Sequence, residues 1–176
     1  MRTRLLVSLA CVALATPASA VTSSAVLLKC QKVLESRVRS FSATLTSNLV
    51  SCTQKVVDCK LVQEIDAVDP TACLASASTL CSGKAAKIAA SRTSNLNKAL
   101  AACGLIPTGD ITPFLGGLGF FNVMNDCGAV DVTGLLTCLF DEARCDTERV
   151  VFRADPRAAD SLAAVGQGAA FPCVAP

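Results

Sequence analysis

Cysteine is the residue type with which this chain could do most chemistry, as a redox pair, a metal ligand or a crosslink. The chain has eleven cysteines and no histidine, which excludes Cys-His nucleophile pairs, histidine-ligated zinc and C-x-x-C-H haem attachment. No C-x-x-C occurs, which argues against a thioredoxin-like redox site or a zinc ribbon. Cysteine gaps of seven, eight and about twenty residues are typical of structural crosslinks. We therefore expect disulfides, no metal and no cofactor.

Acidic residues are the other candidates for catalysis, because paired carboxylates can act as general acid and base. Asp141-Glu142 and Asp146 with Glu148 could provide such a pair. The spacing of these acidic residues is typical of the solvated face of an amphipathic helix. A phosphate-binding site is also not indicated, because the glycines of FLGGLGFF lack the order of a phosphate-binding loop. We expect no catalytic residues, and a carboxylate-based hydrolase is only the third hypothesis for function.

Residues 1–20, MRTRLLVSLACVALATPASA, have the features of a secretory signal peptide. Two arginines precede an apolar run too short to span a membrane, and Ala18-Ser19-Ala20 is a small-residue cleavage site. Cleavage would remove Cys11 and leave ten cysteines, an even number that predicts five disulfides in an oxidising compartment. We expect an exported protein, in the periplasm, at the cell surface or in the medium. Residues 21–176 would form a single helical domain with no transmembrane segment.

Cleavage would also balance the charges, leaving fourteen basic and fourteen acidic residues. This neutrality removes the general argument for nucleic acid, which favours a clear basic excess. Residues 21–109 hold ten Lys/Arg against five Asp/Glu, whereas residues 110–176 hold four against nine. We expect the two halves to attract each other within one fold, the alternative being contacts between neighbouring copies.

Apolar residues recur every three or four positions along two stretches, which predicts two long helices over about 24–58 and 69–103. In both, the steps repeat every eleven residues, or about 3.67 residues per turn, so the apolar stripe stays on one face. Asp69-Pro70 is a typical helix start. Gly83 interrupts the second helix and costs about 1 kcal/mol relative to alanine.

Each predicted helix carries two cysteines 22 residues apart. That spacing corresponds to about 33 Å along a helix, whereas a disulfide needs Cα atoms within about 7 Å. An antiparallel hairpin solves this problem, because facing residues across it keep a constant index sum, here 133 for two pairs and 132 for a third at the tip. The predicted pairs are Cys30–Cys103, Cys52–Cys81 and Cys59–Cys73.

The same register predicts how the two helices pack, mostly large side chains against small ones. Leu34 faces Ala99, Leu45 faces Ile88 and Val56 faces Ala77. Phe41 falls opposite Arg92, whose stem we expect to lie along the ring with its charge in water. A buried functional arginine is the alternative.

After Cys103, we expect a Gly/Pro-rich loop over 104–130 and then a smaller C-terminal part over 131–176. This part has helices over about 131–165 and ends in an extended tail, QGAAFPCVAP. Asp131 is the expected N-cap of its first helix, and Gly166 ends its last. Cys138 and Cys145 share one face about 10 Å apart, so each should bond elsewhere. We expect Cys127–Cys138 and Cys145–Cys173, with the crossed pairing 127–145 and 138–173 open. The predicted fold is an all-α, disulfide-stapled hairpin with a helical C-terminal part.

The segment 113–124, PFLGGLGFFNVM, concentrates large apolar side chains in a glycine-rich loop. They are Phe114, Leu115, Leu118, Phe120, Phe121 and Met124. One interpretation is that the segment folds over the hairpin and fills the core beneath the third helix. The other is an apolar contact surface for a protein partner, a lipid or a membrane.

The arrangement KCQK…L..C…V..C…DPTACL…C…K…R…L…C, followed by PRAADSL and a terminal FPC, resembles a loose group of exported bacterial proteins. These proteins have no assigned function and are built from cysteine-bracketed helices that begin with a Cys-Gln-Lys motif. The resemblance covers Cys30–Cys103 and Pro156–Cys173. It implies export and a helical fold, and it implies no activity.

These features favour a non-catalytic, exported structural or protein-interaction module with a protein partner of unknown identity. The alternative is a carrier of a small apolar ligand or lipid, with residues 113–124 as its gate or lining. The chain lacks the CC and C-x-C pairs of small helical lipid-transfer proteins, which lowers that alternative.

Overall fold

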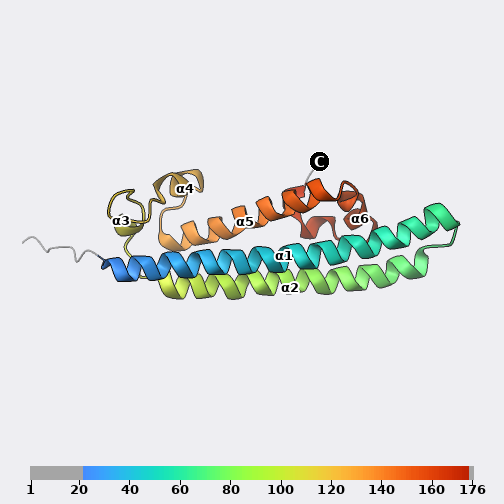
Figure 1. Ribbon diagram of the computed structural model, residues 1–176, viewed down its shortest axis with the longest axis horizontal. Coiled ribbons are helices and arrows are strands. Elements are labelled where there is room, and N and C mark those ends of the chain that lie inside the picture. The colour runs from blue at the N-terminus through green and yellow to red at the C-terminus, as the bar shows by residue number, and fades with distance from the viewer. Residues whose placement is uncertain (1–21, 175–176) are drawn as a thin grey trace, which may run out of the picture.

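The computed structural model describes residues 22–174, which form helices and turns without any β-strand. Two long helices, α1 (Ser24–Asp66) and α2 (Thr71–Cys103), form an antiparallel hairpin, and α5 (Val132–Ala154) packs against both (Figure 1). This arrangement confirms the predicted all-α fold class. The predicted signal peptide over 1–20 lies outside the described residues.

The shorter elements lie at two places along this three-helix body (Figure 1). The helices α3 (Thr108–Ile111) and α4 (Phe121–Asp126) lie at the end where α1 begins, within the predicted 104–130 loop. Helix α6 (Ala158–Ala164) and the 3-10 turns η1 (Gly168–Ala170) and η2 (Pro172–Val174) follow α5. The hairpin tip extends beyond them all.

Three disulfides join α1 to α2 like the rungs of a ladder. They have Cα–Cα distances of 5.0, 4.9 and 5.6 Å and link Cys30 to Cys103, Cys52 to Cys81 and Cys59 to Cys73. Two further disulfides link Cys127 to Cys138 and Cys145 to Cys173, so the crossed alternative is not formed. All five pairs are those that the sequence predicts.

Helix α1 is longer than predicted, because it continues to Asp66 instead of ending near residue 58. Beyond Cys59 its apolar side chains, such as Ile65, are exposed, so these last residues, about two turns at 3.6 residues per turn, bury no stripe that periodicity could detect. The sequence KLVQEID holds good helix formers and no glycine or proline. The helix therefore ends only at Ala67, which adopts a left-handed conformation with φ 55° just before Pro70.

An aspartate lies at the start of α5 and another just before α2, near the places that the sequence predicts. Asp131 accepts a hydrogen bond from the backbone N–H of Gly134 at 2.7 Å and caps α5 as predicted. Helix α2 begins at Thr71 rather than at residue 69. Asp69 nevertheless accepts from both the N–H and the hydroxyl of Thr71, at 2.9 and 2.6 Å, and these bonds lower the pKa of its carboxyl.

The core runs along the hairpin where the predicted facing residues lie. All six of them are buried, namely Leu34, Leu45, Val56, Ala77, Ile88 and Ala99. Phe41 is also fully buried and contacts Phe140 of α5, with ring centroids 5.8 Å apart. The small residues of α2 thus allow close approach of α1, and the larger ones of α1 also supply the contact with α5.

The tail is not extended, which corrects the sequence-based expectation for residues 167–174. After Gly166 ends α6 with φ 70°, the chain makes the turns η1 and η2 and returns to α5. Phe171 is buried between them, and Cys173 bonds to Cys145. This disulfide and the burial of an apolar ring explain why a glycine- and alanine-rich segment is folded back.

Ion pairs join the basic half (21–109) and the acidic half (110–176), and each half supplies an arginine to one of them. Arg92 of α2 pairs with Asp141 of α5, as the charge asymmetry predicts, but Arg157 of the acidic half pairs with Glu64 of the basic half at 2.5 Å. The hydrogen bond between them lowers the pKa of Glu64 and raises that of Arg157. Local pairing, and not only the net charge of each half, therefore links them.

Candidate functional site

The cysteines within residues 22–174 form crosslinks. All ten in the described residues are disulfide-bonded. Within 22–174 no group of three or more His, Cys, Asp or Glu side chains is arranged to hold a metal ion. None of the helices described there has an apolar stretch long enough to cross a bilayer. Candidate sites must therefore be sought among the apolar surface, the grooves and the cavities.

The segment 113–124 divides between surface and core. Phe114, Leu115 and Phe121 are 90%, 87% and 60% exposed, so the interpretation that the whole segment fills the core is wrong for them. Met124 is buried in the core, so its inclusion in a contact surface is wrong instead. Leu118 and Phe120 are partly buried against the core. We call Phe114, Leu115 and Phe121 the apolar loop surface.

Hydrogen bonds hold this loop in one shape. The backbone N–H of Leu118 donates to the carbonyl of Ile111 at 3.1 Å, and that of Gly119 donates to Pro113 at 2.9 Å. A Cβ on Gly117 would lie 2.7 Å from the carbonyl oxygens of Asp110 and Pro113, so only glycine fits there. The exposed rings are therefore displayed by an ordered loop.

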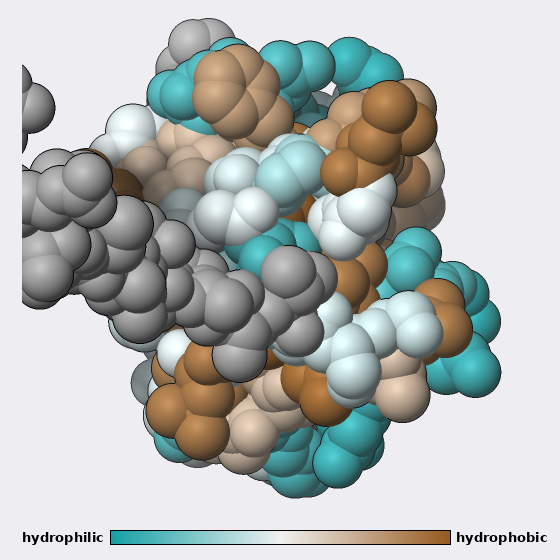
Figure 2. Space-filling model, turned by 90° about the vertical axis from the view of Figure 1, so that its left-hand side faces the viewer, coloured by the Kyte–Doolittle hydropathy of each residue, from teal (hydrophilic) through white to brown (hydrophobic). Residues whose placement is uncertain are grey.

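The start of the described chain is fixed to the same end of the molecule. Thr22 donates to Asp110 Oδ2 from its hydroxyl at 2.5 Å and from its backbone N–H at 2.9 Å. Both bonds lower the pKa of the Asp110 carboxyl, and the bond from the hydroxyl has the larger effect. Figure 2 looks onto this end and shows separate hydrophobic groups among hydrophilic ones.

A groove between α1 and α5 lies next to this loop. Its floor is apolar, and Glu35, Glu142 and Asp146 stand on its rim. The floor is formed by Leu34, Val38, Phe120, Leu139 and Ala143. Because Phe120 lines the groove and its neighbour Phe121 belongs to the apolar loop surface, the two features adjoin.

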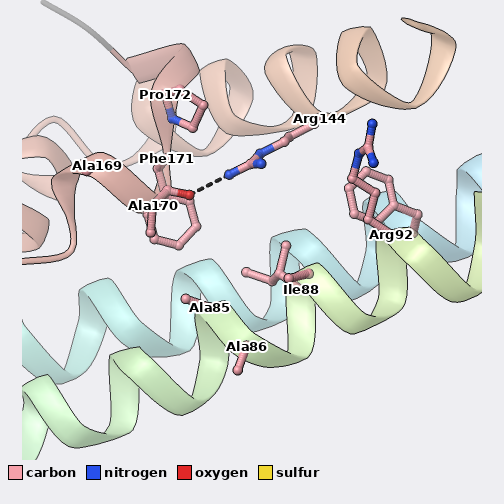
Figure 3. Close-up of a pocket in the computed structure, with 11 residues that line it drawn as sticks. Ala85, Ala86, Ile88, Arg92, Arg144, Ala169, Ala170, Phe171 and Pro172 are labelled. Atoms are coloured by element: carbon pink, nitrogen blue, oxygen red, sulfur yellow. Dashed lines mark hydrogen bonds between the residues drawn. The ribbon is translucent and has the colours of Figure 1, made fainter. Parts of the chain in front are cut away.

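A second, more enclosed cavity of about 410 Å³ lies between α2, α5 and the returning tail. Figure 3 shows Ile88 and the alanines of α2 on one side and Phe171 with its neighbours on the other, with Arg92 at one end and the Arg144 side chain extending from α5 to Ala170. Phe41 also lines it. The walls are therefore apolar, and within residues 22–174 the only charged side chains that line the cavity are these two guanidinium groups.

Each of these two arginines is held by a carboxylate. Arg92 donates from Nε and Nη2 to one oxygen of Asp141, at 2.9 and 2.6 Å, so the charge that was expected in water is held in a partly exposed ion pair. Arg144 donates from Nε to Glu148 at 2.7 Å and from Nη2 to the carbonyl of Ala170 (dashed in Figure 3). Glu148 also accepts from the N–H of Cys173 at 3.1 Å.

Glu148 corrects the expectation that the acidic residues of the third helix form a solvated face. It is fully buried, and its partner Arg144 lies one helical turn before it. A buried carboxylate needs such a partner and hydrogen bonds to both oxygens. The predicted Cys145–Cys173 bond was the available signal, because it brings the tail to this face of α5.

The cavity and the groove were not predicted, since each is lined by segments distant in sequence that tertiary packing brings together. Their lining residues lie on helices whose facing partners only the folded chain identifies. No protein-family model, curated protein or solved structure matches the chain.

Proposed function

We propose that the protein is an exported, non-catalytic interaction module that binds a protein partner through the apolar loop surface. The observation that carries the proposal is the display of Phe114, Leu115 and Phe121 in a loop held by backbone hydrogen bonds. Aromatic side chains held in place beforehand lose little entropy on binding and are common anchors of interfaces.

The rest of the molecule supports a scaffold role. Five disulfides hold a chain of 176 residues with no histidine. Of the four acidic residues that the sequence offered for catalysis, Asp141, Asp146 and Glu148 are each engaged by an arginine. Such pairing suits a structural role for them, whereas general acid–base catalysis needs a carboxylate free to exchange a proton. Crosslinks of this density are typical of proteins that persist outside the cytoplasm.

The test compares two variants that each remove two exposed apolar side chains. F114S/L115S alters the apolar loop surface, and I65S/V68S alters the hairpin tip at the other end (Figure 1). A partner captured from the envelope or medium of the native organism by the unchanged protein should be lost with the loop variant and retained with the tip variant. Equal capture by both variants would refute the role of the loop.

A second candidate function, carriage of a small apolar ligand, is favoured by the groove between α1 and α5. Its apolar floor adjoins the loop through Phe120. Native mass spectrometry of protein purified from its own host separates the two functions. A co-purifying lipid-sized mass that is lost in Leu139→Lys, which places a charge on the floor, would support the carrier. The bare protein mass would reject it.

A further inference from the structure

We propose that the cavity between α2, α5 and the tail binds a small amphipathic anion, an alkyl chain ending in a carboxylate. The proposal does not depend on the apolar loop surface, because no residue of 113–124 lines this cavity. It rests on one juxtaposition: an apolar cavity whose charged lining residues are both arginines, Arg92 and Arg144 (Figure 3).

The apolar part of the cavity suits an alkyl chain. Its volume of about 410 Å³ falls in the range of about 300–1,000 Å³ typical of small-molecule sites. Alanines of α2 and of the tail line it and leave the space open, while Phe41, Ile88 and Phe171 supply larger apolar walls. These three side chains are themselves buried, so the walls are formed before any ligand arrives.

The two guanidinium groups retain donors for an acceptor on the ligand. A guanidinium has five N–H donors. Among the described residues, Nη1 of Arg92 and Nη1 of Arg144 make no hydrogen bond. A planar carboxylate is the group that such a fork binds best. A ligand with its chain between α2 and the tail would direct its terminal group to the end of the cavity at which Arg92 lies.

The carboxylate of Asp141 is the group that a ligand would replace. Its side chain is 55% exposed, whereas that of Arg92 is 24% exposed. Exposed ion pairs contribute little stability, so Asp141 can return to water at small cost. Glu148 differs, since it is fully buried and also accepts from the tail. It keeps Arg144 fixed at the cavity wall, and Arg92 is left as the exchangeable partner.

This exchange predicts opposite effects for two variants that break the same ion pair. Asp141→Asn removes the competing carboxylate and should tighten binding of octanoate about threefold. Arg92→Gln removes the cation and should weaken it about tenfold, to the affinity of octanol. Octanol, which has the same chain without the charge, should bind both variants as it binds the unchanged protein.

The experiment is a calorimetric titration of octanoate and octanol into the full oxidised chain and its variants, each first checked for helicity and unfolding midpoint. Ala89→Leu, which narrows the cavity and leaves both arginines, should abolish binding of both molecules. If Arg92→Gln does not fold, the gain in Asp141→Asn and the loss in Ala89→Leu decide. Octanoate no tighter than octanol, equal effects of the two charge variants, or unchanged binding in Ala89→Leu would each overturn the proposal.

Discussion

The rungs of the hairpin should contribute unequally to stability, although they are chemically alike. Replacing both cysteines of the outer rung, C30A/C103A, should cost more free energy of unfolding than replacing those of the middle rung, C52A/C81A. All four cysteines are fully buried, so the cavities left by the two replacements are similar. The difference between the variants therefore reports on the rings that the disulfides close.

The magnitude follows from the rings that the ladder encloses. The outer and middle rungs enclose 22 residues of each helix, about 44 in all, and the middle and tip rungs enclose about 15. In the chain-entropy model these two closures contribute about 4 and about 3 kcal/mol. Loss of the outer rung removes the first contribution entirely. Loss of the middle rung merges the two rings into one of about 59 residues, which still retains about 4.3 kcal/mol, a net cost of about 2.7 kcal/mol.

Guanidinium unfolding followed by far-UV circular dichroism measures these costs, after mass spectrometry has shown that the other four disulfides are formed. The outer variant should be less stable than the middle variant by about 1.3 kcal/mol. The difference should vanish when both are measured in reductant, where no rings exist. A middle variant that is as unstable as the outer one, or more so, would refute the ring account and assign the cost to packing.

Three further predictions concern single positions. Gly83→Ala should raise the free energy of unfolding by about 0.5–1 kcal/mol, because an added Cβ meets nothing within 4 Å in the middle of α2; an unchanged denaturation midpoint would contradict this. Arg144→Met should cost about 3–5 kcal/mol by leaving buried Glu148 unpaired, and R144M/E148M should recover most of that loss in the same unfolding assay; failure to recover would mean that the pair itself is stabilising. The bonds from Thr22 lower the pKa of Asp110, so they contribute stability above about pH 4 that is lost as the pH falls through the lowered pKa. Asp110→Asn should therefore flatten the dependence of the unfolding midpoint on pH below about 4. An identical slope in the variant would refute the link.

The hairpin was predictable because one periodic pattern determines both its helices and its register. Cysteine pairs spaced like the apolar stripe leave a single antiparallel alignment that satisfies all three rungs. Where the stripe stops, prediction stops too: residues 60–66 stay helical although their apolar side chains are exposed, with Ile65 75% exposed and Glu64 paired with Arg157. A periodic pattern of apolar residues indicates a buried helix face, so it does not predict a helical segment that has no such face.

Glu148 and the tail were missed for a different reason. The charge of a residue predicts exposure only when no partner is available to it. Arg144 precedes Glu148 by one turn, and the folded tail supplies a carbonyl to the arginine and an N–H to the carboxylate. Those partners come from residues 26 and 25 positions away. Short-range patterns do not contain this information, although the Cys145–Cys173 pair points to it.

The crosslinks also explain how the chain can expose large apolar side chains without collapse. The loop that displays Phe114 and Leu115 runs from Cys103 to Cys127, and both of these cysteines are bonded. Cys103 fixes one end to α1, and Cys127 fixes the other to α5. An unanchored loop of this composition would gain free energy by folding its rings onto the nearest apolar groove. With both ends fixed and the interior hydrogen-bonded, that motion would break the backbone bonds that hold the loop. The two disulfides therefore keep the apolar side chains of the loop exposed and available for binding.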